Sequence, residues 1–197
     1  MIFKKVIKNE ESDLMMELEM PQEWSDISIQ QYFNIVDLIQ NKDNMGDASF
    51  FVKMVSILSK ADESKLMDYP ISEFVSLQDT LNNFSADKIP TNCPDLVVIG
   101  DITFVPKKNM SNLTTNEMIW ISNIEKNSKT KSDEILGKLT VLLRPGYQKV
   151  DEAGVTKWIQ TVYNNDDFES RKKLFYDNLS VIDGIPLINF FLTGLRS

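Results

Sequence analysis

The feature that most constrains the fold of this chain is a helix-start signal that occurs twice. Segments 27–32 and 113–118 each place a Ser or Thr at the N-cap and a Gln or Glu at the third helical position. This pair forms a capping box, and the apolar residues before the cap and at the fourth helical position form a hydrophobic staple. The two caps, Ser28 and Thr114, stand 86 positions apart. The sequence therefore predicts two helices that begin in the same way, one in each half.

Each of these helices is preceded by a predicted β-hairpin. In the first half, the alternating apolar segments Ile2–Ile7 and Leu14–Glu19 flank a polar turn, and Pro21 ends the second strand. In the second half, segments 96–99 and 102–105 flank Gly100-Asp101, which is a two-residue hairpin signal. Pro106 again follows the second strand.

Each capped helix is followed by a polar loop and a second helix. Asp47 is the predicted cap of the second helix in the first half, and its counterpart in the second half begins at about Ser132. The segment Arg144-Pro145-Gly146 is predicted to stop that counterpart. The expected apolar faces are Tyr32, Ile35, Val36 and Ile39; Phe51, Met54, Val55 and Leu58; Met118 and Ile121; and Leu136, Leu139 and Leu143.

Four further helices are predicted outside this repeated order. One starts at Tyr69-Pro70-Ile71-Ser72 and carries Phe74, Leu77 and Leu81, and a short one covers Thr156–Tyr163. A third capping box, Asp166–Glu169, opens a helix through Arg171, Leu174 and Phe175. The last covers Ile185–Leu192, with Pro186 in its first turn and Gly194 at its C-cap.

The predicted fold class is α+β, mostly helical, with two hairpin-plus-two-helix units and a C-terminal helical segment. We place the units at residues 1–88 and 89–197, with the boundary in Asp87–Cys93. Capping boxes are common, so the shared order is either an internal duplication or a chance match of two α+β segments. The agreement at the junctions favours duplication.

Composition places the chain among soluble globular proteins, since 42% of its 197 residues are hydrophobic and 25% are charged. Cys93 is the only cysteine, which fits a reducing compartment. The start, Met1–Lys5, lacks the apolar run of a signal peptide, and Ile185–Leu195 is too short to span a bilayer. We therefore expect no membrane association.

The net charge of −8 lies entirely in the first half, where residues 1–88 hold 8 Lys and Arg against 16 Asp and Glu. The second half holds 13 of each sign. No basic stripe is present, which argues against direct nucleic-acid binding. The acidic half is either a solvated face or a steering surface for a basic partner, and we favour the solvated face.

The residue types leave little room for catalysis. The chain has no histidine and one cysteine, which excludes the usual serine and cysteine triads and the common zinc, haem and iron–sulfur sites. Its seven glycines form no phosphate-binding loop. We therefore expect no cofactor and no metal.

Carboxylates are the only remaining candidates for catalysis or for a hard cation. Three groups stand out: Asp166, Asp167 and Glu169; Asp62 and Glu63; and Glu17 and Glu19. Paired carboxylates serve glycosidases and calcium sites. Helix capping and polar turns explain the first two groups more simply, so we assign no catalytic residue.

Three aromatic residues are candidate contacts for a protein partner. Trp120 lies about 100° away from the expected Met118/Ile121 face of its helix. A Trp outside its own core is a natural interface residue. Phe190 and Phe191, in the apolar C-terminal segment, complete the set.

The segments Pro21–Tyr32 and Phe104–Met118 resemble patterns in small virion or assembly proteins of tailed bacteriophages, the crAss-like phages in particular. The shared pattern is a Trp, then Asp-Ile-Ser or Thr, two residues, a Gln or Glu and an aromatic. In the second copy, Met110 replaces the Trp and Met118 replaces the aromatic.

This resemblance implies a non-enzymatic virion component, a subunit of a homo-oligomeric ring or connector near the portal and tail. Its partners would be other phage structural proteins, and it would be made in the host cytoplasm. Two alternatives stay open: a soluble tail-assembly chaperone that is absent from the particle, and a carboxylate-dependent hydrolase.

Overall fold

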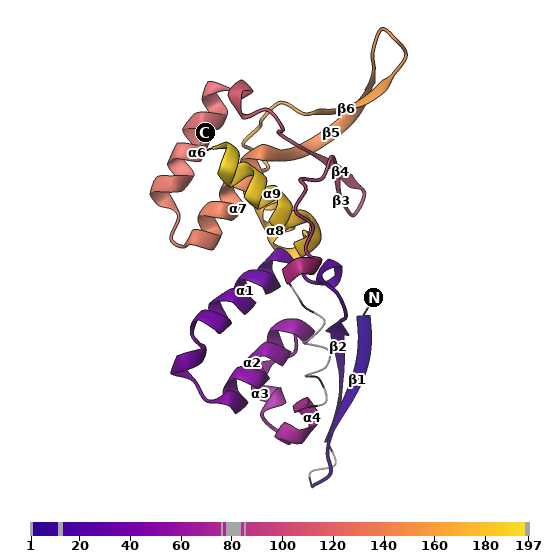
Figure 1. Cartoon of the computed structure of the whole chain (residues 1–197), viewed down its shortest axis with the longest axis vertical. Coiled ribbons are helices and arrows are strands. Elements are labelled where there is room, and N and C mark those ends of the chain that lie inside the picture. The colour runs from indigo at the N-terminus through magenta and orange to yellow at the C-terminus, as the bar shows by residue number, and fades with distance from the viewer. Residues whose placement is uncertain (1, 12–13, 76, 78–83, 85, 196–197) are drawn as a thin grey trace. The chain divides into compact units, whose positions relative to one another are not determined.

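The computed structural model describes residues 2–11, 14–75, 77, 84 and 86–195. The chain divides into two compact units, Met1–Ile89 (unit 1) and Pro90–Ser197 (unit 2) (Figure 1). The division falls inside the segment Asp87–Cys93. The fold class is α+β and mostly helical, as predicted.

Unit 1 opens with the predicted hairpin. Strands β1 (Ile2–Asn9) and β2 (Leu14–Pro21) pair antiparallel, and β2 ends at Pro21 as expected. Successive side chains of a strand point to opposite faces. One face of the hairpin accordingly buries Ile7, Leu18 and Met20 in the core of the unit. The register pairs Ile2 with Pro21, Lys5 with Leu18 and Asn9 with Leu14.

A 3₁₀ turn, η1 (Trp24–Asp26), leads to helix α1 (Ile29–Gln40), which begins with the predicted capping box. The Gln31 amide donates to Ser28 Oγ at 3.3 Å, and Gln31 Oε1 accepts from the Ser28 amide at 3.1 Å. The cap therefore satisfies two backbone N–H groups that a helix start leaves without partners.

Helix α2 (Asp47–Ser59) follows the turn η2 (Lys42–Asn44), but its cap differs from the prediction. Gly46 is the N-cap, and Asp47 is the first helical residue and caps nothing. An acid in the first turn still interacts favourably with the helix dipole, which explains the residue type. As predicted, the helix buries Met54, Val55 and Leu58, whereas Phe51 is half-buried.

Unit 1 then continues through short helices. Lys60 adopts a left-handed conformation with φ of 59° and ends α2. Helices α3 (Glu63–Leu66) and α4 (Ile71–Val75) follow, and η3 (Ala86–Lys88) lies near the unit boundary. Phe74 and Leu77 are buried as expected, whereas Leu81 lies outside the described residues.

Unit 2 contains a four-stranded antiparallel sheet. The predicted hairpin forms from β3 (Val97–Ile99) and β4 (Ile102–Pro106), and Gly100 takes the positive φ of 58° that its turn requires. Strands β5 (Leu143–Val150) and β6 (Thr156–Gln160) extend the sheet in the order β3-β4-β5-β6. The register pairs Val97 with Phe104, Phe104 with Pro145, and Gly146 with Gln160.

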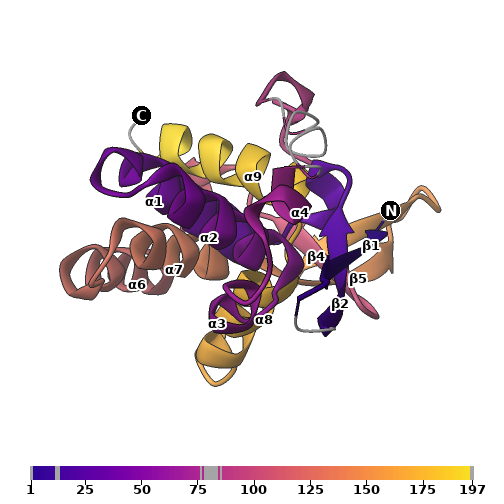
Figure 2. The same ribbon diagram turned by 90° about the horizontal axis from the view of Figure 1, so that it is seen from below.

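After the turn η4 (Met110–Asn112), helices α6 (Thr115–Asn127) and α7 (Lys131–Leu142) run side by side (Figure 2). They pack closely at Gly137, where an added Cβ would lie 2.9 Å from Ile124 Cγ2. Thr114 and Glu117 form the predicted capping box. Leu136, Leu139 and Leu143 are buried as expected.

The buried faces of α1 and α6 are centred one position earlier than predicted. Ile39 and Met118 are exposed, although the sequence pattern placed both on the apolar face. In each helix the third helical residue is itself buried and starts the inward stripe at i, i+4 and i+7. The stripes are Gln31, Ile35 and Leu38 in α1, and Glu117, Ile121 and Ile124 in α6.

The segment after α7 confirms one prediction and contradicts another. Helix α7 ends at Leu142, just before Arg144-Pro145-Gly146 as predicted, and passes directly into β5. The segment Thr156–Tyr163, predicted as helical, contains strand β6 instead. Its Thr, Trp and Ile residues favour strands, and pairing with β5 stabilises the segment as a strand rather than a helix.

Helix α8 (Phe168–Asn178) forms as predicted, but its capping box does not. Asp167 is the N-cap and makes no side-chain cap. Its carboxylate instead lies 2.5 Å from Arg171 Nη1. An i,i+4 ion pair has replaced the predicted cap.

The last helix, α9 (Val181–Gly194), starts earlier than predicted. Ser180 caps it by accepting from the Asp183 amide at 3.3 Å. Pro186 is therefore inside the helix and not in its first turn, and Gly194 is the last helical residue. Within the described part of the chain, no helix is long and apolar enough to cross a membrane.

Candidate functional site

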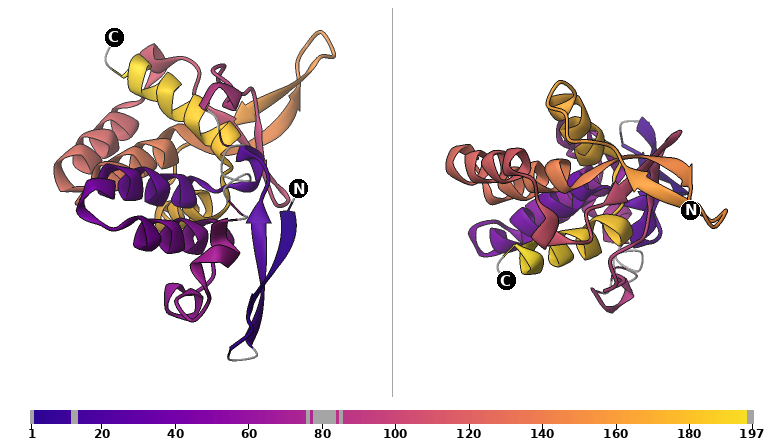
Figure 3. Two further views of the ribbon diagram at one scale, coloured as in Figure 1. Left: turned by 60° about the horizontal axis from the view of Figure 1, so that its bottom comes forward. Right: turned by 90° about the horizontal axis from the view of Figure 1, so that it is seen from above.

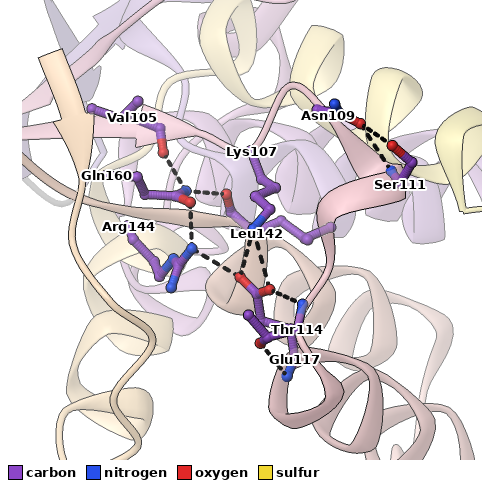
Figure 4. A network of polar contacts seen from close by, with 9 residues as sticks. All are labelled: Val105, Lys107, Asn109, Ser111, Thr114, Glu117, Leu142, Arg144 and Gln160. Carbon is purple, nitrogen blue, oxygen red and sulfur yellow. Dashed lines mark hydrogen bonds and ion pairs between the residues drawn. The ribbon is translucent and has the colours of Figure 1, made fainter. Parts of the chain in front are cut away.

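The most concentrated polar chemistry in unit 2 is a buried network at the start of α6. Glu117 is 0% exposed, and its carboxylate accepts the Thr114 amide at 2.6 Å (Figure 4). Arg144 Nη2 lies 2.8 Å from Glu117 Oε1, and Lys107 Nζ lies 3.2 Å from Oε2. One carboxylate thus joins the end of β4, the start of α6 and the start of β5.

The network holds Glu117 ionised. Burial raises the pKa of its carboxyl group, but the Thr114 N–H and the cations Arg144 and Lys107 outweigh burial and leave the pKa below its usual range. Burial also lowers the pKa of Arg144, against the opposing effect of Glu117. A buried charge is tolerated when it is paired and hydrogen-bonded, as Glu117 is.

Gln160 of β6 completes the network from the other side. Its Nε2 donates to the Val105 carbonyl at 2.7 Å and to the Leu142 carbonyl at 2.8 Å. Its Oε1 accepts from Arg144 Nη2 (Figure 4). Leu142 is the last residue of α7, and its carbonyl accepts from both the Gln160 side chain and the Lys107 amide, the latter at 2.9 Å.

A second arginine extends the cluster towards α8. Arg171 Nε donates to the Thr140 carbonyl at 3.3 Å. The Arg144 guanidinium lies 6.0 Å from the centre of the Tyr163 ring, and burial raises the pKa of the Tyr163 hydroxyl to about 12. Tyr163 therefore stays protonated at neutral pH and donates to Asn165 Oδ1 at 2.9 Å.

None of these network residues was singled out as a site by the sequence, apart from Glu117 as a capping residue. One signal was available. Arginine occurs only at positions 144, 171 and 196, although Lys and Arg together number 21. Two of the three arginines are buried in this cluster.

Of the predicted carboxylate groups, only Asp167 touches this cluster, through its ion pair with Arg171. Asp166, Asp167 and Glu169 are exposed at the start of α8, and Asp166 accepts from Asn164 Nδ2 at 3.2 Å. Glu17 lies 2.6 Å from Lys4 on the outer face of the hairpin. These contacts are structural ion pairs and turns.

Asp62 likewise has a structural role. It caps α3 by accepting the Ser64 amide at 2.9 Å, and bonds from Ser64 lower the pKa of its carboxyl group. Among the described residues, each carboxyl group with a shifted pKa has it lowered. No group of three or more metal-ligating side chains occurs within that part of the chain either.

A cleft of about 400 Å³ lies between α7 and α8 and is lined by Asp133, Glu169 and Lys172 among others. It contains one residue of the predicted carboxylate groups, Glu169. Asp133 Oδ1 forms an ion pair with Lys172 Nζ at 2.5 Å, and this contact holds the pKa of the Asp133 carboxyl group below its usual value. At Asp133 the cleft therefore holds a paired, ionised carboxylate.

The three candidate interface residues have different environments. Trp120 is half-buried, and its ring centre lies 5.5 Å from Phe168 and 6.4 Å from Tyr163. Phe191 is 2% exposed and belongs to the core, so it offers no surface to a partner. Phe190 is half-buried and packs edge-to-face on Phe191.

The most exposed regular structure in unit 2 is the outer part of the β5–β6 hairpin, residues 147–157, here called the arm. It extends away from the rest of the unit (Figures 1 and 3). Its tip is ordered by Asp151 Oδ1, which accepts from the Val155 amide at 2.9 Å, and by Gly154 with φ of 78°. The arm exposes three apolar side chains, those of Tyr147, Val150 and Val155.

The chain was compared with protein-family models, with curated proteins and with solved structures. None of the three comparisons finds a match.

Proposed function

We propose that this chain is a non-enzymatic structural component of a tailed-phage virion, a ring or connector subunit that acts through protein–protein contacts. The observation that carries the proposal is the arm. It exposes apolar side chains on a hairpin that contributes little to the core of its own unit. The arm presents these side chains away from the core of its unit, where another protein can contact them.

The use of ionisable groups supports a structural role over a catalytic one. A general acid or base needs a pKa matched to its task, and active sites usually obtain it by burial and like charges. Of the carboxylates that the structure describes, only that of Glu117 is fully buried, and it is paired with two cations and has a lowered pKa. Its chemistry holds β4, α6 and β5 together.

Trp120 and Phe190 are the remaining candidate contacts from the sequence. Trp120 leans on Phe168 and Tyr163 but keeps part of its ring exposed, as a hot-spot aromatic at the edge of an interface would. Phe191 supports Phe190 from within the core.

The decisive experiment is quantitative mass spectrometry of purified virions of the encoding phage, complemented with wild-type chain or with an arm variant. The variant is Tyr147→Ser/Val150→Ser/Val155→Ser. We expect the wild type in stoichiometric copy number and the variant reduced at least about tenfold, since the loss of three apolar contacts removes several factors of ten in affinity. Native mass spectrometry of the purified chain tests the ring.

The matched control is Val98→Ser/Ile102→Ser, which removes exposed apolar side chains from the shorter β3–β4 hairpin. It should be incorporated normally. Absence of the wild-type chain from mature particles would favour the tail-assembly chaperone instead. Normal incorporation of the arm variant would contradict the proposal that the arm binds a neighbour in the particle.

A further inference from the structure

The two buried arginines of unit 2 each retain a nitrogen without a partner. Arg144 and Arg171 are each 5% exposed. Among the described residues, Arg144 Nε and Arg171 Nη2 are buried side-chain nitrogens for which no hydrogen-bond acceptor is found. Buried donors are nearly always satisfied, so these two require an acceptor that the described residues do not supply.

The two guanidinium groups share one environment. Arg144 belongs to β5, and its guanidinium lies 6.0 Å from the centre of the Tyr163 ring. Arg171 belongs to α8, donates to the Thr140 carbonyl and pairs with Asp167. The charge of Arg171 disfavours the charged form of Arg144, and both arginines act on the Tyr163 hydroxyl. Like charges held together out of water repel each other unless an anion lies between them.

The charges of the cluster do not balance. The cations are Arg144, Arg171 and Lys107, and the anions are Glu117 and Asp167. One positive charge is left over, and half of the Asp167 side chain is in solvent. An anion would supply the missing acceptor and the missing charge together, whereas a water molecule supplies only the acceptor.

We infer that unit 2 binds one small inorganic anion of the chloride class, held by Arg144 Nε and Arg171 Nη2 beside Tyr163. Arginine suits this role because its rigid, weakly hydrated fork presents several donors and stays charged when buried. The use of two of the chain's three arginines here, in a protein otherwise rich in lysine, fits that chemistry. The inference does not depend on a role in a virion.

The test is the thermal unfolding of the full chain in a chloride titration at constant ionic strength, with gluconate as the replacement anion too large for an enclosed site. A ligand that binds only the folded state stabilises it by mass action. We expect the Tm of unit 2 to rise by at least about 4 °C for each tenfold increase of chloride above its Kd. Hydrogen exchange resolved by segment assigns the change to unit 2.

Two variants locate the effect. Arg171→Gln removes one unpartnered donor and one charge, so its Tm should no longer depend on chloride. Lys138→Gln is the matched control, because Lys138 is a buried cation of the same unit whose partners Glu125 and Glu134 lie at 2.6 and 2.7 Å. It should lose stability and keep the chloride dependence.

Crystals of the wild-type protein grown in bromide provide a readout that does not depend on the variants. An anomalous peak within about 3.5 Å of both nitrogens is expected, a distance at which a charge-assisted contact is effective. A Tm equal in chloride and gluconate, or an equal response in Arg171→Gln, would overturn the inference. A bromide peak without stabilisation would mean an adventitious ion only, and a water in its place would also overturn it.

Discussion

The two units solve the same structural problem with different chemistry. In each, the third helical residue of the capped helix is buried, and its side chain forms part of the capping box. In unit 1 this residue is Gln31, whose Nε2 donates to the Ile57 carbonyl at 2.9 Å and the Leu58 carbonyl at 3.0 Å. In unit 2 it is Glu117, 86 positions later, which can only accept.

This difference explains the rest of the network in unit 2. A buried carboxylate needs cations, which Arg144 and Lys107 provide. The Leu142 carbonyl at the end of α7 accepts from the Lys107 amide and from the side-chain amide of Gln160, whereas in unit 1 the side-chain amide at the helix end is that of Gln31. The buried acid of unit 2 is therefore accompanied by two cations, Arg144 and Lys107.

The largest expected effect comes from exchanging these two residues. Gln31→Glu places a carboxylate against two carbonyls, and Glu117→Gln leaves Arg144 and Lys107 without their counter-charge. Each change should cost about 3–5 kcal/mol of unfolding free energy, the usual cost of breaking a buried pair or burying an unpaired charge. Urea denaturation with segment-resolved hydrogen exchange measures each unit separately.

Gln31→Ala provides the comparison for the first exchange. It removes the two bonds without adding a charge and should cost only about 1–3 kcal/mol. If Gln31→Glu costs no more than Gln31→Ala, the charge requirement inferred from unit 2 is wrong.

A smaller effect on stability is expected when the pH is lowered. It should arise at Glu117 in unit 2 and not at Gln31 in unit 1. The pKa of Glu117 is lower in the folded chain than in the unfolded chain. Its contribution to stability is therefore full above the unfolded pKa of about 4.3 and is lost as the pH falls through the folded value. Gln31 does not titrate, so the same position of unit 1 makes no such contribution.

The measurement is the urea midpoint of unit 2 between pH 6 and pH 3, for the wild type and for Glu117→Gln. The variant should show a shallower decrease below about pH 4.3, since only the other carboxyl groups then titrate. Equal slopes in the two proteins would contradict the role assigned to Glu117.

The smallest expected effect comes from removing the side-chain caps of the two helices. The loss of stability should be the same in both units. Ser28→Ala and Thr114→Ala each remove one side-chain acceptor from a helix start. Each should cost about 1 kcal/mol. Thermal unfolding with segment-resolved exchange measures both, and unequal costs would show that the buried network of unit 2 depends on its cap.

Local signals predicted the fold where the local sequence decides the structure. The caps at Ser28 and Thr114, the Gly100-Asp101 turn and the strand ends at Pro21 and Pro106 all form as expected. Each depends on interactions within a few residues. The predicted cap at Asp166 failed because Asp167 found a competing partner one turn later, Arg171.

Non-local structure could not be predicted in the same way. Segment 156–160 is a strand because β5 lies beside it, and nothing within the segment reveals that partner. Apolar periodicity also missed the buried positions of Gln31 and Glu117, because it counts polar residues as exposed. The network residues Lys107, Arg144 and Gln160 come from three separate strand regions and meet only in the folded unit.

The direct passage from α7 into β5 has a mechanical consequence. Leu142 ends the helix, Leu143 begins the strand, and both side chains are fully buried. No loop separates the anchored helix from the projecting hairpin, so the arm has no hinge at its base. A force applied to the tip of the arm would act through β5 directly on the packed core of unit 2. A neighbour bound to the arm, as we propose, would therefore be held in a set direction.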